Sequence, residues 1–177
     1  MKWVSFQRTS STINSHNKEL MMKQTVEFDK IQQQMQKGVI TLHGFLGDDK
    51  RKLVDILESD NLTVRKHHTT HQAIADRMEY FRQRGLSGLG EFITVDEDFE
   101  VKVETVRGML PSPFGGKGMY GKANTTVRNK KLDRTIVFTD LHIHFIGDHG
   151  FYEGKGSPFR LEPEDLIAIL EVPVVEE

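Results

Sequence analysis

The feature that most constrains this chain is an alternating run of apolar and polar residues, TIVFTDLHIHFIG, over Thr135–Gly147. On a β-strand, successive side chains point to opposite faces of the sheet. The alternation predicts a long strand with one largely apolar face. On its other face Asp140, His142 and His144 would stand in a row. We therefore expect a sheet in which this strand is central and carries a polar row.

The periodicity of the chain changes near residue 90, from helical spacing to alternation. We expect helices over 17–37, 49–59, 70–84 and 164–170, and strands over 91–95, 99–107, 123–128, 135–147 and 151–153. Helices followed by a series of strands indicate an α+β fold. The predicted sheet is an antiparallel β-meander of about five strands, or a partly closed barrel. A short C-terminal helix follows it.

The length of 177 residues fits one domain, with ordinary hydrophobic (37%) and charged (28%) fractions. We expect residues 1–20 to form a loose polar extension and residues 21–177 to form a single α+β domain. The start resembles a signal peptide only briefly, because Gln7 and Arg8 interrupt its apolar residues. The chain also has no run of about 18 apolar residues, the length that predicts a membrane helix. These observations predict a soluble, cytoplasmic protein without a membrane partner.

Net charge and cysteine content exclude several classes of site. The net charge is −2, so the chain lacks the general basic field that favours nucleic acid. It has no cysteine, which excludes disulfides and thiolate metal sites. Any metal ion would need His, Asp or Glu as ligands.

A loop rich in glycine and lysine, GGKGMYGK, covers Gly115–Lys122. Glycines allow backbone N–H groups to converge on an anion, and lysines add positive charge. The order of residues is not that of a P-loop, and no helix is expected after it. The predicted ligand-binding residues are Gly116, Lys117, Gly118, Lys122 and Arg128.

The polar row of the predicted strand offers two kinds of chemistry. Histidines can exchange protons near neutral pH, so His142 and His144 are the predicted acid–base groups. Alternatively, a divalent metal could be bound by Asp140, His142, His144 and His149. The H-x-H pair resembles that of cupins, which add a glutamate shortly afterwards and a later histidine. This chain has no glutamate before Glu153 and no histidine after His149, so a metal is not the favoured reading.

The segment HGFLG, His43–Gly47, resembles the segment that helps build the oxyanion hole of α/β-hydrolases. That resemblance would also imply a G-x-S-x-G nucleophile elbow between a strand and a helix. The segment GLSGLG, Gly85–Gly90, has its second glycine one position too early, and a strand is expected after it. A hydrolase is therefore not favoured, and we expect a glycine turn leading into a helix.

Three functions remain open, and the sequence orders them. The first is binding of a small anionic ligand through the Gly115–Lys122 loop and the His/Asp strand face. The second is a non-catalytic assembly module, including a homo-oligomer, that pairs through the sheet face or the helix over 17–37. The third is a metal-dependent enzyme.

Overall fold

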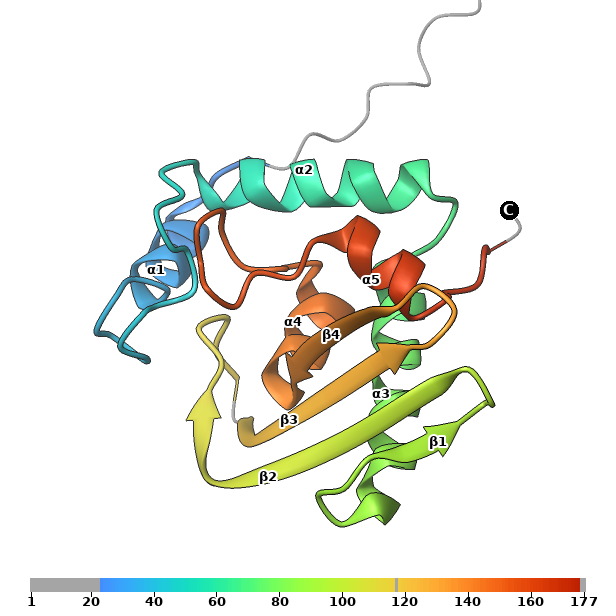
Figure 1. The fold of residues 1–177 in the computed structure, drawn as a ribbon. Coiled ribbons are helices and arrows are strands. Elements are labelled where there is room, and N and C mark those ends of the chain that lie inside the picture. Colours follow the sequence, from blue (N-terminus) through green and yellow to red (C-terminus); the bar gives the residue numbers. More distant parts are fainter. Residues whose placement is uncertain (1–22, 117, 176–177) are drawn as a thin grey trace, which may run out of the picture.

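The computed structural model describes residues 23–116 and 118–175, which form an α+β fold (Figure 1). The described helices are α1 (Val26–Gln34), α2 (Leu53–Lys66), α3 (His71–Gly85), the short 3-10 helix η1 (Leu86–Gly88), α4 (Asp140–His149) and α5 (Pro163–Ile169). The described strands are β1 (Ile93–Val95), β2 (Phe99–Pro111), β3 (Met119–Asn129) and β4 (Arg134–Thr139). The predicted extension over residues 1–20 lies outside the described residues.

The described strands form one antiparallel sheet in the order β1-β2-β3-β4, so neighbours in sequence are neighbours in the sheet. The long β2–β3 hairpin dominates it, with Phe99 opposite Asn129 at one end and Pro111 opposite Met119 at the other. A register shift between Val106 and Met109 contains Gly108, whose φ of 116° favours glycine. This irregularity lies where the hairpin leaves the body of the sheet (Figure 1).

One face of the sheet is covered by α3 and α4, as Figure 1 shows. Alternate residues of β2 point into this core, including Phe99 and Val101, which are almost fully buried. They pack with Met78 and Phe81 of α3 and with Phe138 of β4. The alternation expected over residues 99–105 therefore holds from Phe99 to Val103, as in a half-buried antiparallel strand, whereas Thr105, expected on the same face, is exposed.

A second apolar cluster joins the N-terminal helices to α4. Its buried members include Met35, Phe45, Leu53, Phe145 and Phe151. The rings of Phe45 and Phe145 meet edge to face, with 5.3 Å between centroids. The cluster holds the loop after α1 against α4 and so fixes the surroundings of the sites described below.

The glutamines near α1 have a role within the molecule. No side chain at the N-cap of α2 accepts a hydrogen bond from its first N–H groups. Instead, the side-chain oxygen of Gln32 accepts from the N–H of Leu53 at 2.9 Å, and that of Gln24 accepts from Val54 at 3.3 Å. These bonds satisfy donors that a helix start leaves unpaired.

The prediction of one long strand over Thr135–Gly147 is wrong in its second half, because β4 ends at Thr139 and α4 begins there. The Thr139 hydroxyl accepts from the backbone N–H of His142, and the His142 ring accepts from the backbone N–H of Thr139. This reciprocal capping starts a helix. Gly150, with a φ of 62°, ends it.

An alternating pattern misled the prediction because positions i and i+4 share a face in both a strand and a helix. Leu141 and Phe145 form one such buried pair, and His142 and Ile146 form another. As a result, the described sheet has four strands and is open, where about five strands or a partly closed barrel were expected. Residues 151–153 are not a strand either.

The helix lengths also bear on membranes. Over residues 23–116 and 118–175, no helix combines the length and the apolar character that crossing a bilayer requires.

Candidate functional site

Two loops that are far apart in sequence, residues 43–48 and 153–157, pack backbone against backbone. The N–H of Gly154 donates to the carbonyl of Phe45 at 2.8 Å, and that of Asp48 donates to Lys155 at 3.2 Å. A Cβ at Gly154 would lie 2.3 Å from the carbonyl oxygen of Leu46. A Cβ at Gly47 would lie 2.1 Å from the backbone nitrogen of Ser157. Side chains do not fit at such distances, so Gly47 and Gly154 allow the loops to interlock.

The interlocked loops, together with β2, β3 and the β4–α4 junction, surround a cavity of about 410 Å³, here called the loop cavity. Its lining residues are Thr41, His43, Gly44, Phe45, Val106, Leu110, Gly121, Lys122, Asn124, Thr139, Leu141, His142, Glu153 and Phe159. This volume is within the range of small-molecule sites. The cavity therefore joins the HGFLG segment, Lys122 and His142, which the sequence had singled out separately.

The walls of the loop cavity are mainly apolar, and its residues differ in depth. Phe45 and Leu141 are buried, with 4% and 5% of their surface exposed. Val106 and Phe159 are about half exposed, at 56% and 53%, and so lie at the rim. The cavity thus has an apolar interior and an apolar rim that is open to solvent.

A buried histidine–glutamate pair forms part of the wall. The backbone N–H of Thr139 donates to Nδ1 of His142 at 3.1 Å. An N–H can only donate, so this nitrogen carries no proton, and the ring proton lies on Nε2. Nε2 then donates to Oε1 of Glu153 at 3.0 Å, while the Ser157 hydroxyl donates to the other oxygen. Both nitrogens of His142 are therefore engaged.

Three polar side chains of the lining remain without such partners. Within the described parts of the chain, His43, Lys122 and Asn124 make no side-chain hydrogen bond or ion pair with one another or with other residues. The ring of His43 only approaches that of Phe159, with 6.3 Å between centroids. These groups offer a cation and several donors to a molecule in the cavity.

The structure brings together only some of the predicted ligand-binding residues. Lys122 lines the loop cavity, whereas Gly116 and Gly118 are exposed at the tip of the β2–β3 hairpin and are not lining residues. Arg128 lies towards the other end of β3 and pairs with Glu100 at 3.3 Å. Lys117 lies outside the described residues. Among the described residues of the predicted ligand-binding set, Lys122 is therefore the one through which the Gly115–Lys122 loop contributes to the loop cavity.

The structure does not bring the four predicted metal ligands together, because residues on a helix rotate by about 100° each. Asp140 faces α3, where it accepts from Nε of Arg82 at 2.6 Å and from Nη2 at 3.2 Å. His142 points to the opposite side of α4 and is held by Glu153. His144, in the middle of α4, and His149, in its last turn, remain.

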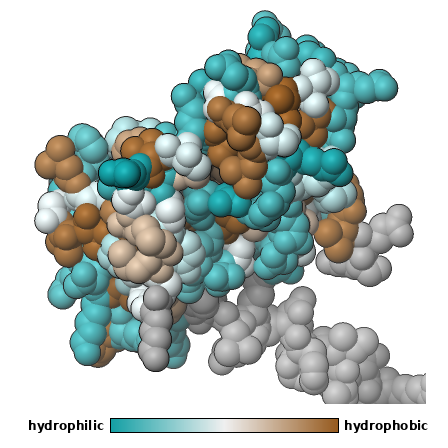
Figure 2. All heavy atoms as spheres, turned by 90° about the horizontal axis from the view of Figure 1, so that it is seen from below, coloured by the Kyte–Doolittle hydropathy of each residue, from teal (hydrophilic) through white to brown (hydrophobic). Residues whose placement is uncertain are grey.

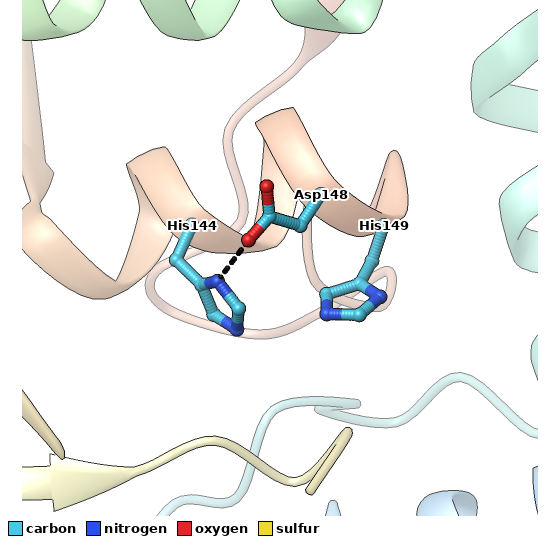
Figure 3. A group of neighbouring side chains, drawn as sticks. All are labelled: His144, Asp148 and His149. Atoms are coloured by element: carbon cyan, nitrogen blue, oxygen red, sulfur yellow. Dashed lines mark hydrogen bonds and ion pairs between the residues drawn. The ribbon is translucent and has the colours of Figure 1, made fainter. Parts of the chain in front are cut away.

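His144 and His149 form a group with Asp148, here called the α4 cluster, in which all three side chains project from the same side of the helix (Figure 3). Nδ1 of His144 lies 2.7 Å from Oδ2 of Asp148. The ring of His149 stacks on Phe114, with 3.9 Å between centroids. Burial lowers the pKa of His149, and a positive charge on His144 lowers it further.

The sequence prediction missed Asp148 because it placed the residue after a strand. Its spacing of four from His144 would have indicated the contact once α4 was recognised as a helix.

His144 also contacts the hairpin tip. The contacts from Ser112 through His144 to Asp148 follow the order of a nucleophile–base–acid triad, but the surroundings of these residues differ from those of a triad. Nε2 of His144 lies 3.1 Å from the hydroxyl of Ser112. Ser112 is only 7% exposed, whereas the Asp148 side chain is 64% exposed. In a catalytic triad the hydroxyl must be reachable and the carboxylate is buried. The contact therefore holds the hairpin tip against α4.

Comparison with known proteins identifies no relative of this chain. No family model matches the chain, and no match is found among curated proteins or among solved structures. The function must be inferred from the geometry of this chain.

Proposed function

We propose that the protein binds a small molecule with an apolar body and one anionic group in the loop cavity. The observation that carries this proposal is the contrast between the apolar walls and the unpartnered polar groups of His43, Lys122 and Asn124. Pockets for small molecules combine an apolar lining with a few polar groups that orient the ligand. A cytoplasmic location remains part of the proposal.

The charge on the lining favours an anion. Lys122 has no carboxylate partner among the described residues. The lining carboxylate, Glu153, already accepts from His142 and Ser157. A ligand carboxylate could therefore pair with Lys122 without competition from the wall. Because Lys122 is exposed, such an ion pair contributes about 1 kcal/mol, or a few-fold in affinity.

The arrangement supports binding in preference to turnover. An acid–base catalyst needs a proton-accepting or proton-donating atom within reach of the substrate. Both nitrogens of His142 are engaged, and His144 does not line the loop cavity. We propose that His142 positions Glu153 and the β4–α4 junction and is not itself a catalyst.

The proposal can be tested with three simple probes: decanoate, decanol and acetate. Decanoate has both the apolar chain and the charge, decanol has only the chain, and acetate has only the charge. We expect isothermal titration calorimetry to rank decanoate above decanol and to show no binding of acetate. Equal binding of decanol and decanoate would contradict the anionic part of the proposal, and binding of neither would contradict the proposal as a whole.

Variants locate the binding. Lys122→Ala should weaken decanoate about threefold to fivefold and leave decanol unchanged, because only the solvent-screened charged contact is lost. Lys130→Ala is the matched control, since Lys130 is exposed in the turn after β3, outside the cavity lining. Val106→Trp should weaken both probes, because the larger ring fills the rim. Loss of decanoate binding in Lys130→Ala to the same extent would indicate a general charge effect.

A second candidate, assembly through an apolar surface, rests on a different region. Leu89 is 92% exposed and Phe92 is 49% exposed, and both lie between η1 and β1. Apolar residues on the surface seen in Figure 2 form several separate patches amid hydrophilic residues. If the patch with Leu89 and Phe92 pairs two chains, light scattering will show a concentration-dependent dimer that Leu89→Ser abolishes. A monomer at all concentrations would contradict this candidate.

A further inference from the structure

The α4 cluster has the chemistry of a cation site that is separate from the loop cavity. His144, Asp148 and His149 each offer one ligand atom, and these atoms lie within 4.8 Å of one another. We propose that this cluster binds one divalent transition-metal ion of the zinc class. Its protein ligands are Nδ1 of His144, a carboxylate oxygen of Asp148 and one ring nitrogen of His149.

The donor types select the class of ion. Two imidazoles and one carboxylate suit zinc and neighbouring transition metals, whereas magnesium and calcium prefer sites made wholly of oxygen ligands. The chain has no cysteine, so these are the residue types with which it can build such a site.

The three ligand atoms lie within 4.8 Å of one another, so their spacing must change by up to about 1.5 Å to match a tetrahedral ion. Nδ1 of His144 and Oδ2 of Asp148 lie 2.7 Å apart. Two ligands at tetrahedral zinc, with bonds of about 2.0–2.2 Å, lie roughly 3.3–3.5 Å apart. The Asp148 side chain is 64% exposed, so its carboxylate can move by this amount without displacing packed atoms.

The surroundings orient the two imidazoles. A histidine that binds metal through one nitrogen usually donates its other N–H to a nearby acceptor. When Nδ1 of His144 binds the ion, Nε2 carries the proton and can donate to the Ser112 hydroxyl at 3.1 Å. The His149 ring is held by stacking on Phe114, with an angle of 5° between the planes. Both rings are thus oriented before an ion arrives.

The position on α4 also favours positive charge. His149 is in the last turn of the helix, and Gly150 is the C-cap. Carbonyl groups at a helix C-terminus carry partial negative charge, which stabilises a cation nearby.

Three protein ligands leave room for another ligand. Asp148 and His144 line an open cavity of about 550 Å³, and Asp148 and His149 line another of about 370 Å³. Glu27 of α1 also lines the smaller cavity. Sites with three protein ligands and an accessible position bind water or an incoming molecule at the fourth position.

The test is a titration of the full chain, without a polyhistidine tag, with zinc chloride in a calorimeter. We expect one ion per chain and no heat of binding with magnesium chloride. His149→Ala and Asp148→Asn should each weaken zinc at least tenfold. His43→Ala is the matched control and should bind as the wild type does, because His43 is exposed and remote from the cluster in sequence and in cavity lining.

A second readout keeps the test independent of folding losses. Cobalt(II) bound by nitrogen and oxygen ligands of the wild-type protein should give visible absorption bands that excess zinc removes. Circular dichroism of each variant reports whether it is folded. Absence of zinc binding to the wild type would overturn the proposal. Zinc binding that survives in folded His144→Ala/His149→Ala would overturn it as well.

Discussion

The two ends of α4 carry similar residues in contrasting surroundings. At the N-terminal end, His142 is 4% exposed and both of its ring nitrogens are engaged, one by Thr139 and one by Glu153. Two residues further on, the His144 side chain is also largely buried, at 11% exposed, and its ring nitrogens contact Asp148, Tyr120 and Ser112, but its partner Asp148 is 64% exposed. The closed end shapes the wall of a cavity, and the open end can exchange its partners. The exposure of the carboxylate partner, buried for Glu153 and exposed for Asp148, therefore separates the positioning histidine from the candidate ligand.

The largest expected difference between the two ends is in stability. His142→Ala removes a partner of the buried Glu153 carboxylate, which should lower the free energy of unfolding by about 3–5 kcal/mol. His144→Ala should cost only about 1–2 kcal/mol, because water can solvate Asp148. Urea unfolding of both variants measures the difference. Equal losses would show that the two ends are not distinct.

The next effect concerns the interlocked loops that support the closed end. Gly154→Ala places a Cβ 2.3 Å from the backbone of Leu46, so the loops must separate. We expect a loss of about 2–3 kcal/mol in thermal or urea unfolding. Gly38→Ala is the control, because its Cβ meets no atom within 4 Å, although its φ of 81° adds backbone strain. A larger loss at Gly38 than at Gly154 would refute the close packing of the loops.

A smaller effect tests whether residues 140–149 form a helix. Thr139→Ala removes the side-chain acceptor at the N-cap of α4 and should cost about 1 kcal/mol. Thr139→Ser keeps a hydroxyl and should retain most of the stability. If residues 135–147 formed a continuous strand, neither substitution would remove a helix cap. An equal loss of stability in the two variants would therefore contradict the helix.

The smallest effect is a pH dependence at the C-terminal end, where His71 lies close to Gly150. Burial lowers the pKa of His71, against the opposing charge of Asp60. Below the ordinary histidine pKa of about 6.5, the unfolded chain then binds more protons than the folded one. Stability should fall as the pH drops through that value towards the lowered pKa.

His71→Gln is the variant that isolates this contribution. Its unfolding free energy, measured in urea between pH 7.5 and 5.5, should have a flatter slope than that of the wild type. A slope that is unchanged by the substitution would assign the pH dependence to other groups.

Local patterns in the sequence were sufficient for much of the fold. Thr69 or Thr70 was expected as the N-cap of the helix over 70–84, and the Thr70 side chain does cap α3, accepting from Ala73 at 3.1 Å. The alternation correctly indicated a half-buried strand from Phe99 to Val103, although Thr105 is exposed. The α+β class followed from these elements.

The site depended on contacts that local patterns do not contain. The i, i+4 pairs of α4 look alike in a strand and in a helix, so the helix was recognisable only from its ends, Thr139 and Gly150. The pairing of His142 with Glu153 and the meeting of two glycine loops are tertiary contacts. Without them, HGFLG remained an isolated motif in the sequence.

One experiment tests the separation of the two ends most directly: histidine side-chain NMR of a single uniformly ¹⁵N-labelled sample, titrated first with decanoate and then with zinc. Decanoate should shift the ring signals of His43, and zinc should shift those of His144 and His149. His142 should keep the spectrum of a ring protonated at Nε2 in both titrations. If zinc shifted His142, or if both additions shifted the same histidines, the closed end and the open end would not be separate sites.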